Sequence, residues 1–170
     1  MENIGKPPRK AFPKAFQVFV FRRDHWLCHL CRRPVVFAPA LKYLQQYLQR
    51  ELAQECPDLS YWRYAYTREF APLLDELAAV IDHVNPHVRG GPGNEANLKT
   101  ACNKCNSRKN DHDYAKWVRD NPIRKNKGKE PVMWDGFSSL FMFLANRDPG
   151  NLATTEKAWL KALGNKEMRG

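Results

Sequence analysis

The sequence predicts an α+β protein with one main hydrophobic core. Its 170 residues suffice for one modest domain with helical additions, and 43% hydrophobic with 27% charged residues is an ordinary balance for a folded chain. Segments with helical periodicity stand on both sides of residues 81–111, where that periodicity fades and Gly, Pro, Asn, His and Cys concentrate. We expect the functional residues in this irregular centre.

Helical patterns occur on both sides of the centre. The run KAFQVFVFRR suits a strand or a helix, and we expect a helix. Two amphipathic helices are predicted between residues 38 and 80, and further helices over residues 114–120, in FSSLFMFLAN and in TEKAWLKAL. The amphipathic pair has these apolar stripes: Leu41, Leu44, Leu48 and Leu52 in one helix, and Phe70, Leu73, Leu77 and Val80 in the other. We expect both stripes to be packing surfaces.

These elements suggest a division of the chain into four parts. Residues 1–13 read as a flexible basic arm, and residues 14–121 as the main domain with a helical insertion at 38–80. A basic linker is expected at 122–130 and a helical extension at 131–170. The extension holds five aromatic residues expected to be buried: Trp134, Phe137, Phe141, Phe143 and Trp159.

Four of the five cysteines form two C-x-x-C pairs. Cys28 and Cys31 are one pair, and Cys102 and Cys105 are the other. Two residues between cysteines allow a turn that aims both sulfurs at one ion, so we predict a tetrahedral zinc site. Four thiolates leave no open position on the ion, hence the zinc is expected to be structural. The alternatives to a zinc site are that one pair is a redox motif or that all four cysteines are ordinary buried thiols. We expect His29, inside the first pair, to be a surface residue and Cys56 to be a plain structural residue.

The net charge favours nucleic acid as the partner. The chain has a formal charge of +10, and its basic residues concentrate towards the two ends. The segment MENIGKPPRKAFPK lacks the apolar core of a secretory signal, and no run of about 18 apolar residues occurs. We therefore expect a cytoplasmic protein without a membrane partner.

The central segment carries a compact set of polar residues. Asp82-His83 is followed by Pro86, Gly90-Gly91, Asn97-Leu98 and then CNKCNSRK, in which Asn106 directly follows the second cysteine pair. This order resembles the His-Asn-His (HNH) endonuclease family, whose zinc-containing members carry D-H-x-x-P, a glycine pair, N-L and C-x-x-C-N-x-x-K. The resemblance covers about residues 16–113. This sequence has Asn106 where many relatives have the final histidine. It also departs from the family in having a long insertion after Cys31.

The resemblance implies a ββα-metal fold and a nuclease site. Two short strands would hold His83 and Asn97, and a helix entered at the second cysteine pair would deliver Asn106. His83 would be the general base that activates water, Asp82 and Asn106 would bind a catalytic divalent ion, and Asn97 would fix the loop that orients the base.

The residue types fit phosphodiester hydrolysis independently of the resemblance. A neutral imidazole can take a proton from water near pH 7, and a carboxylate with an amide carbonyl suits Mg²⁺ or Mn²⁺. Arg108 and Lys109 follow on the same helix, Lys109 at the family's lysine position, and phosphate binding is their expected role. Arg89 and His87 are further candidates for contact with nucleic acid.

The predicted function is a metal-dependent endonuclease, with DNA a more favoured substrate than RNA and double-stranded DNA as the partner. Restriction, nicking and phage-associated activity are all compatible with it. One alternative is a non-catalytic zinc module that binds nucleic acid. Another is a protein-interaction adaptor, in which the insertion at 38–80 forms a homodimer or binds a protein partner.

Overall fold

The computed structural model describes residues 11–52, 76–122 and 133–164. Its regular elements, in chain order, are α1 (Lys14–Arg23), α2 (Ala38–Leu52), β1 (Ala79–His83), β2 (Leu98–Cys102), α4 (Asn103–Lys109), α5 (Tyr114–Asp120), α6 (Ser138–Arg147) and α7 (Thr154–Gly164). Short 3-10 helices cover His87–Arg89, Glu95–Asn97 and Pro149–Asn151. The protein is thus an α+β chain with a small sheet. None of the helices described is both long and apolar enough to span a membrane.

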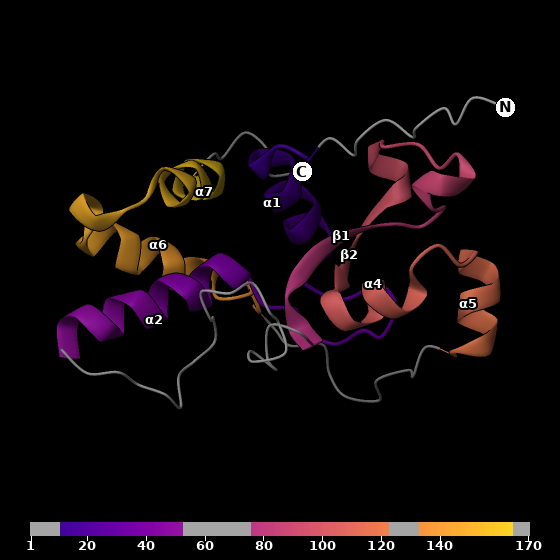
Figure 1. Ribbon diagram of the computed structural model, residues 1–170, viewed down its shortest axis with the longest axis horizontal. Helices are drawn as coiled ribbons and strands as arrows, with labels where there is room; N and C mark the ends of the chain where they lie inside the picture. Colours follow the sequence, from indigo (N-terminus) through magenta and orange to yellow (C-terminus); the bar gives the residue numbers. More distant parts are fainter. Residues whose placement is uncertain (1–10, 53–75, 123–132, 165–170) are drawn as a thin grey trace, which may run out of the picture.

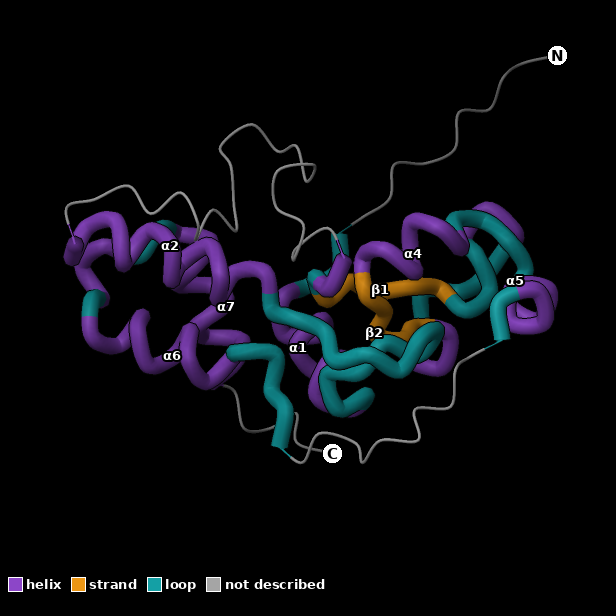
Figure 2. Tube along the Cα trace, turned by 90° about the horizontal axis from the view of Figure 1, so that it is seen from below, coloured by secondary structure: helices purple, strands orange, loops and turns teal. Residues whose placement is uncertain are grey.

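A two-stranded antiparallel sheet lies at the centre of the functional half. β1 pairs with β2 so that Ala79 faces Cys102 and His83 faces Leu98. α4 follows β2 without a loop and contacts both strands. In Figures 1 and 2, β1, β2, α4 and α5 lie on one side of the molecule, α2, α6 and α7 lie on the other, and α1 lies between them.

The strand β1 corrects the sequence prediction for the second insertion helix. That helix was expected to extend to Val80, whereas Val80 is paired with Ala101 in β1 and only Glu76 and Leu77 are helical in its described part. Pairing with β2, together with a bridge from Ala78 to Val36, overrides the local helical pattern. The rest of this segment, including Phe70 and Leu73, lies outside the described residues, as does Cys56.

The other predicted helices are confirmed. α1 matches the run from Lys14 to Arg23, and α5 ends at Asp120, before Asn121-Pro122. α2 contains the first leucine stripe and packs mainly against α6, where Tyr43 meets Phe141 with a ring-centroid distance of 5.7 Å. Thus part of the apolar face of α2 is covered by α6.

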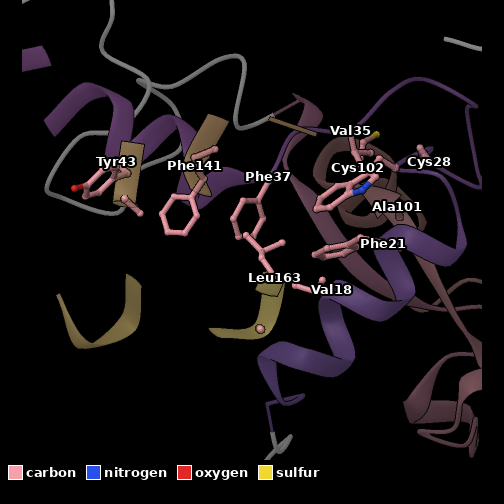
Figure 3. Packing of buried hydrophobic residues seen from close by; sticks show 14 of the residues in the cluster. Val18, Phe21, Cys28, Val35, Phe37, Tyr43, Ala101, Cys102, Phe141 and Leu163 are labelled. Atoms are coloured by element: carbon pink, nitrogen blue, oxygen red, sulfur yellow. The ribbon is translucent and has the colours of Figure 1, made fainter. Parts of the chain in front are cut away.

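One hydrophobic core joins the two sides of the molecule. Figure 3 shows Val18 and Phe21 of α1, Phe141 of α6 and Leu163 of α7 in a continuous layer with Phe37, and this layer reaches Cys28 and Cys102. The rings of Phe141 and Trp159 both meet Phe37 edge-on, at centroid distances of 5.7 and 5.1 Å. The C-terminal extension therefore belongs to the main core.

Phe143 departs from the expected burial of the C-terminal aromatics. Its side chain is 57% exposed, and the guanidinium of Arg147 lies 5.6 Å from its ring centroid. Phe141, two positions earlier on α6, is fully buried. In a helix such a step of two residues moves a side chain to nearly the opposite face, which explains the difference.

Candidate active site

The four paired cysteines come together in one cluster. Cys28 and Cys31 lie in the turn after α1, Cys102 ends β2 and Cys105 lies on α4. Their sulfur atoms all lie within 4.8 Å of one another, and Cys31 Sγ is 3.9 Å from Cys102 Sγ. Four sulfurs at about 2.3 Å from one zinc ion would be about 3.8 Å apart, so the cluster has the size of a tetrahedral zinc site.

The chemistry of the cluster fits zinc as well. A hydrogen bond with Cys102 is the main cause that lowers the pKa of Cys31, and a hydrogen bond with the same residue is the main cause that raises the pKa of Cys28. A bound cation would favour the thiolate form of all four cysteines. One ion bound by the four cysteines would hold residues 28–31 and 102–105 together.

A small polar pocket lies between β1 and α4. Its volume is about 140 Å³, and its lining residues are Ile81, Asp82, His83, Pro86, Asn106, Ser107 and Asn110. Asp82 and His83 are the last two residues of β1, whereas Asn106 directly follows Cys105 on α4. The structure therefore brings together three of the four residues predicted to form the catalytic centre.

The carboxylate of Asp82 is buried and has two side-chain partners. Lys109 Nζ donates to Asp82 Oδ1 at 2.9 Å and to the main-chain oxygen of His83 at 2.7 Å. His29 Nε2 lies 2.8 Å from Asp82 Oδ2 and donates to it, because a carboxylate only accepts. The Asp82 side chain is 4% exposed. A buried charge needs such partners to offset its lost hydration.

Two of these residues differ from the sequence-based expectation. Lys109 was expected on the surface in contact with phosphate, but its side chain is 0% exposed and faces the carboxylate. His29 was expected on the surface, and that prediction is wrong, since its side chain is 13% exposed and stacks on Tyr114 at a centroid distance of 5.6 Å. The position of His29 between two metal-ligand cysteines was the available signal that it would be fixed near a site.

Asn97 closes the loop between the strands. Its side-chain nitrogen donates to the main-chain oxygens of Asn85 (3.0 Å) and Pro92 (2.8 Å), and its side-chain oxygen accepts from the main-chain nitrogen of Asn85 (2.7 Å). Asn97 lies outside the pocket lining, directly before β2. Gly91 permits the close approach, because a Cβ at this position would come within 1.8 Å of the oxygen of Asn85.

The imidazole of His83 lies among aromatic rings. Its centroid is 5.7 Å from that of Phe12 and 6.0 Å from that of His87. Phe12 also packs against Phe16 at 5.6 Å, which ties this residue to α1. The sequence placed residues 1–13 in a flexible arm and gave no sign that Phe12 reaches the site; residues 1–10 lie outside the described part.

The remaining predicted nucleic-acid contacts lie at the surface. Arg89, His87 and Arg108 are all exposed. The side chain of Arg89 donates to the main-chain oxygen of Asp111 at 2.7 Å, and Arg108 lies over the ring of Trp117 at 5.9 Å. Both arginines are therefore oriented by neighbours, and each keeps donors for other partners because a guanidinium has five N–H groups.

The oxygen atoms around the pocket fit a hard divalent cation. The lining supplies the carboxylate of Asp82, the amides of Asn106 and Asn110 and the hydroxyl of Ser107. Oxygen donors of this kind suit Mg²⁺ or Mn²⁺ rather than zinc. Each carboxylate oxygen has two lone pairs, so the bonds from Lys109 and His29 leave acceptor capacity on Asp82.

The two strands, the helix that follows them and the cysteine cluster form the ββα arrangement with a metal-binding cluster that the sequence predicted. Residues 72–112 match the family model described as HNH endonuclease, so this segment is an HNH domain. The match ends three residues after Lys109 and includes the whole pocket lining. Comparison with curated proteins gave no match, and neither did comparison with solved structures.

Proposed function

We propose that this chain is a metal-dependent endonuclease that hydrolyses phosphodiester bonds, with double-stranded DNA as the favoured substrate. The observation that carries the proposal is the pocket lined by Asp82, His83 and Asn106 inside the segment matching the HNH endonuclease model. The net charge of +10 supports a polyanionic substrate. Restriction, nicking and phage-associated roles all use this chemistry.

Each residue has a distinct part in the proposed reaction. His83 takes a proton from the attacking water, as a neutral imidazole does near pH 7. Asp82 and Asn106 would hold Mg²⁺ or Mn²⁺, which supplies charge neutralisation at the phosphate when bound. Asn97 keeps the loop after β1 closed through its three hydrogen bonds and so restrains His83 at the loop's start. Arg89, Arg108 and His87 would contact the nucleic-acid backbone.

The proposal is tested by incubating the purified chain with supercoiled plasmid in Mg²⁺ or Mn²⁺. We expect nicked or linear product, no product in EDTA, and a rate about 10²–10⁴-fold lower for His83→Ala, the usual contribution of a general base. The matched control is His25→Asn, an exposed histidine outside the pocket, which should cleave as the unmodified chain does. Equal cleavage by His83→Ala would overturn the proposed role of the base.

Substrate preference needs a separate comparison. Duplex DNA, single-stranded DNA and RNA of the same sequence are offered at equal concentration, and we expect the fastest cleavage of duplex DNA. Salt-sensitive binding of nucleic acid without turnover would instead favour the non-catalytic module. Absence of binding at low salt would favour the protein-interaction adaptor.

A further inference from the structure

We infer that His29 is a positioning residue that couples the four-cysteine cluster to the catalytic carboxylate of Asp82. The inference rests on the proposed nuclease function and assigns this chain a feature outside the segment matching the family model, which begins at residue 72. Its basis is one short contact, between His29 Nε2 and Asp82 Oδ2 at 2.8 Å, made by a side chain that lies between two zinc-ligand candidates.

His29 is held from three sides. Its main-chain nitrogen donates to the oxygen of Thr100 on β2 at 2.9 Å, and its ring stacks on Tyr114 of α5 with an interplanar angle of 18°. Its neighbours Cys28 and Cys31 belong to the four-cysteine cluster. The strand and the metal-binding turn fix the main chain of His29, and the helix fixes its ring, so the side chain loses less rotamer freedom when it donates to Asp82.

Lys109 and His29 bind different oxygen atoms of the Asp82 carboxylate. Lys109 Nζ occupies Oδ1 from the α4 side, whereas His29 occupies Oδ2 from the side of the first cysteine pair. Two donors on different oxygens fix both the position and the rotation of the carboxylate group. Outer partners of a metal-binding carboxylate commonly contribute 10–100-fold (an order-of-magnitude range) to metal affinity or activity.

The cluster thereby has an effect beyond holding the fold. When the turn at Cys28–Cys31 is fixed, the imidazole of His29 is fixed with it, and so is the oxygen of Asp82 that it binds. Cys105 acts in parallel on the other side, because Asn106 of the pocket follows it directly on α4. Each cysteine pair is thus within one residue of a group that reaches the pocket or its carboxylate.

The test measures metal binding directly as well as cleavage. Zinc-loaded chain and its His29→Ala, His29→Gln and His25→Asn variants are titrated with Mn²⁺, followed by the loss of the free-ion electron paramagnetic resonance signal. Zinc content and melting temperature are recorded for each variant. We expect His29→Ala to weaken Mn²⁺ binding about 10–100-fold with one zinc retained, and to require correspondingly more Mg²⁺ for cleavage.

His29→Gln keeps an N–H donor at a similar reach, so it should recover most of the affinity, and His25→Asn should bind Mn²⁺ normally. Unchanged Mn²⁺ binding in His29→Ala would overturn the inference, as would equal losses in the Ala and Gln variants. If the unmodified chain cleaves DNA while His29→Ala keeps its metal dependence, the inference alone fails. If the unmodified chain neither binds Mn²⁺ nor cleaves, the proposed function fails with it.

A second, milder variant keeps the inference testable if His29→Ala does not fold. Tyr114→Leu removes the ring that stacks on His29 but leaves both His29 and the cysteines in place. Should His29→Ala lose zinc or fail to fold, Tyr114→Leu is expected to weaken Mn²⁺ binding by a smaller factor, several-fold, with zinc content unchanged. Mn²⁺ affinity equal to that of the unmodified chain in this variant would then overturn the inference.

Discussion

The ion pair between Lys109 and Asp82 is the most deeply buried charge contact described in the chain. Their side chains are 0% and 4% exposed. At such a site the attraction and the lost hydration are both large, and removing one partner leaves the other charge without compensation. His29 and the carbonyl of His83 also contact this pair.

Lys109→Met should therefore destabilise the protein strongly. Met fills a similar volume but leaves Asp82 with His29 as its remaining side-chain partner, and breaking a buried pair costs about 3–5 kcal/mol. Urea unfolding curves at pH 7 measure the loss. Lys116→Met, at an exposed position on α5, is the control and should change the free energy of unfolding by less than about 0.5 kcal/mol. A loss below about 1 kcal/mol for Lys109→Met would contradict the buried pairing.

Gly91 is a second residue whose environment makes a sharp prediction. A Cβ there would overlap the main-chain oxygen of Asn85, the atom to which Asn97 donates. Gly91→Ala should force the loop to move, costing about 1–3 kcal/mol, and should slow cleavage because His83 begins this loop. Thermal melts and plasmid assays measure both effects. Gly93→Ala is the matched control, since its Cβ would meet its nearest atom, on Phe12, at 3.9 Å.

At the scale of elements, α1 is tied to the sheet by a polar clamp at its C-terminal end. Asp24 accepts from the main-chain nitrogen of Thr100 at 2.7 Å and from the guanidinium of Arg23 at 2.9 and 3.2 Å. Arg23 in turn donates to the oxygen of Leu98 at 2.6 Å. Burial alone raises the pKa of Asp24, but the hydrogen bonds from Arg23 and Thr100 outweigh it, and the pKa is lowered overall.

Asp24→Ala should cost about 1–3 kcal/mol at pH 7, because it leaves the buried nitrogen of Thr100 without its acceptor. A lowered pKa means that the folded state prefers the ionised carboxylate, so this stabilisation is present above the ordinary pKa of 3.8 and is lost as the pH falls through the lower folded value. Unfolding at a series of pH values measures it. Asp120→Ala, an exposed carboxylate that also neighbours an arginine, should show neither effect.

How far the sequence predicts the elements depends on whether their determinants are local. α2, α5, α6 and α7 follow from periodicity and from stop signals such as Asn121-Pro122, and they are confirmed. α1 is confirmed too, although the pattern of its residues suits a strand as well as a helix. The start of β1 is not predictable in this way, because Ala79 and Val80 are strand residues only through their partners Cys102 and Ala101. His29 and Lys109 show the same limit: their burial depends on Asp82, which is 53 and 27 positions away in the chain.

At the scale of the whole molecule, the four-cysteine cluster joins segments that are distant in sequence. It lies where the hydrophobic core reaches Cys28 and Cys102, so zinc binding and hydrophobic packing would stabilise the fold at the same place. Structural zinc binds zinc-finger peptides with about 10–16 kcal/mol, and domains of ordinary size are stable by about 5–15 kcal/mol. Zinc binding is thus large enough to decide whether the chain folds.

Removing a ligand should accordingly unfold or severely destabilise the protein. Cys102→Ser is expected to lower the zinc-to-protein ratio well below one and to abolish a cooperative thermal transition under conditions where the unmodified chain melts once. A strong chelator should produce the same loss. Cys56→Ser, the cysteine outside both pairs, should retain zinc. Full stability of a zinc-free chain would contradict a structural role for the ion.

The charge distribution also acts at the scale of the molecule. Duplex binding by the His83→Ala chain should weaken linearly on a log–log plot against salt, because lysine and arginine release counterions. Arg108→Ala, next to the pocket residue Ser107, should reduce the magnitude of that slope by about 1, which corresponds to the loss of about one phosphate contact. Arg50→Ala, on α2 and paired with Asp148 at 2.8 Å, is the control and should leave the slope unchanged. Equal slopes for all three proteins would contradict binding at the α4 side.

The direct succession of Cys105 and Asn106 on α4 limits how this chain can vary in length. Adjacent helical residues differ in direction by about 100°, so inserting one residue between them would turn everything beyond by that angle and translate it by about 1.5 Å. Asn106 would then leave the pocket lining and Lys109 would leave Asp82, while Cys105 stayed with its partner sulfurs. A single-codon insertion at this junction would therefore separate the cysteine cluster from the residues of the pocket.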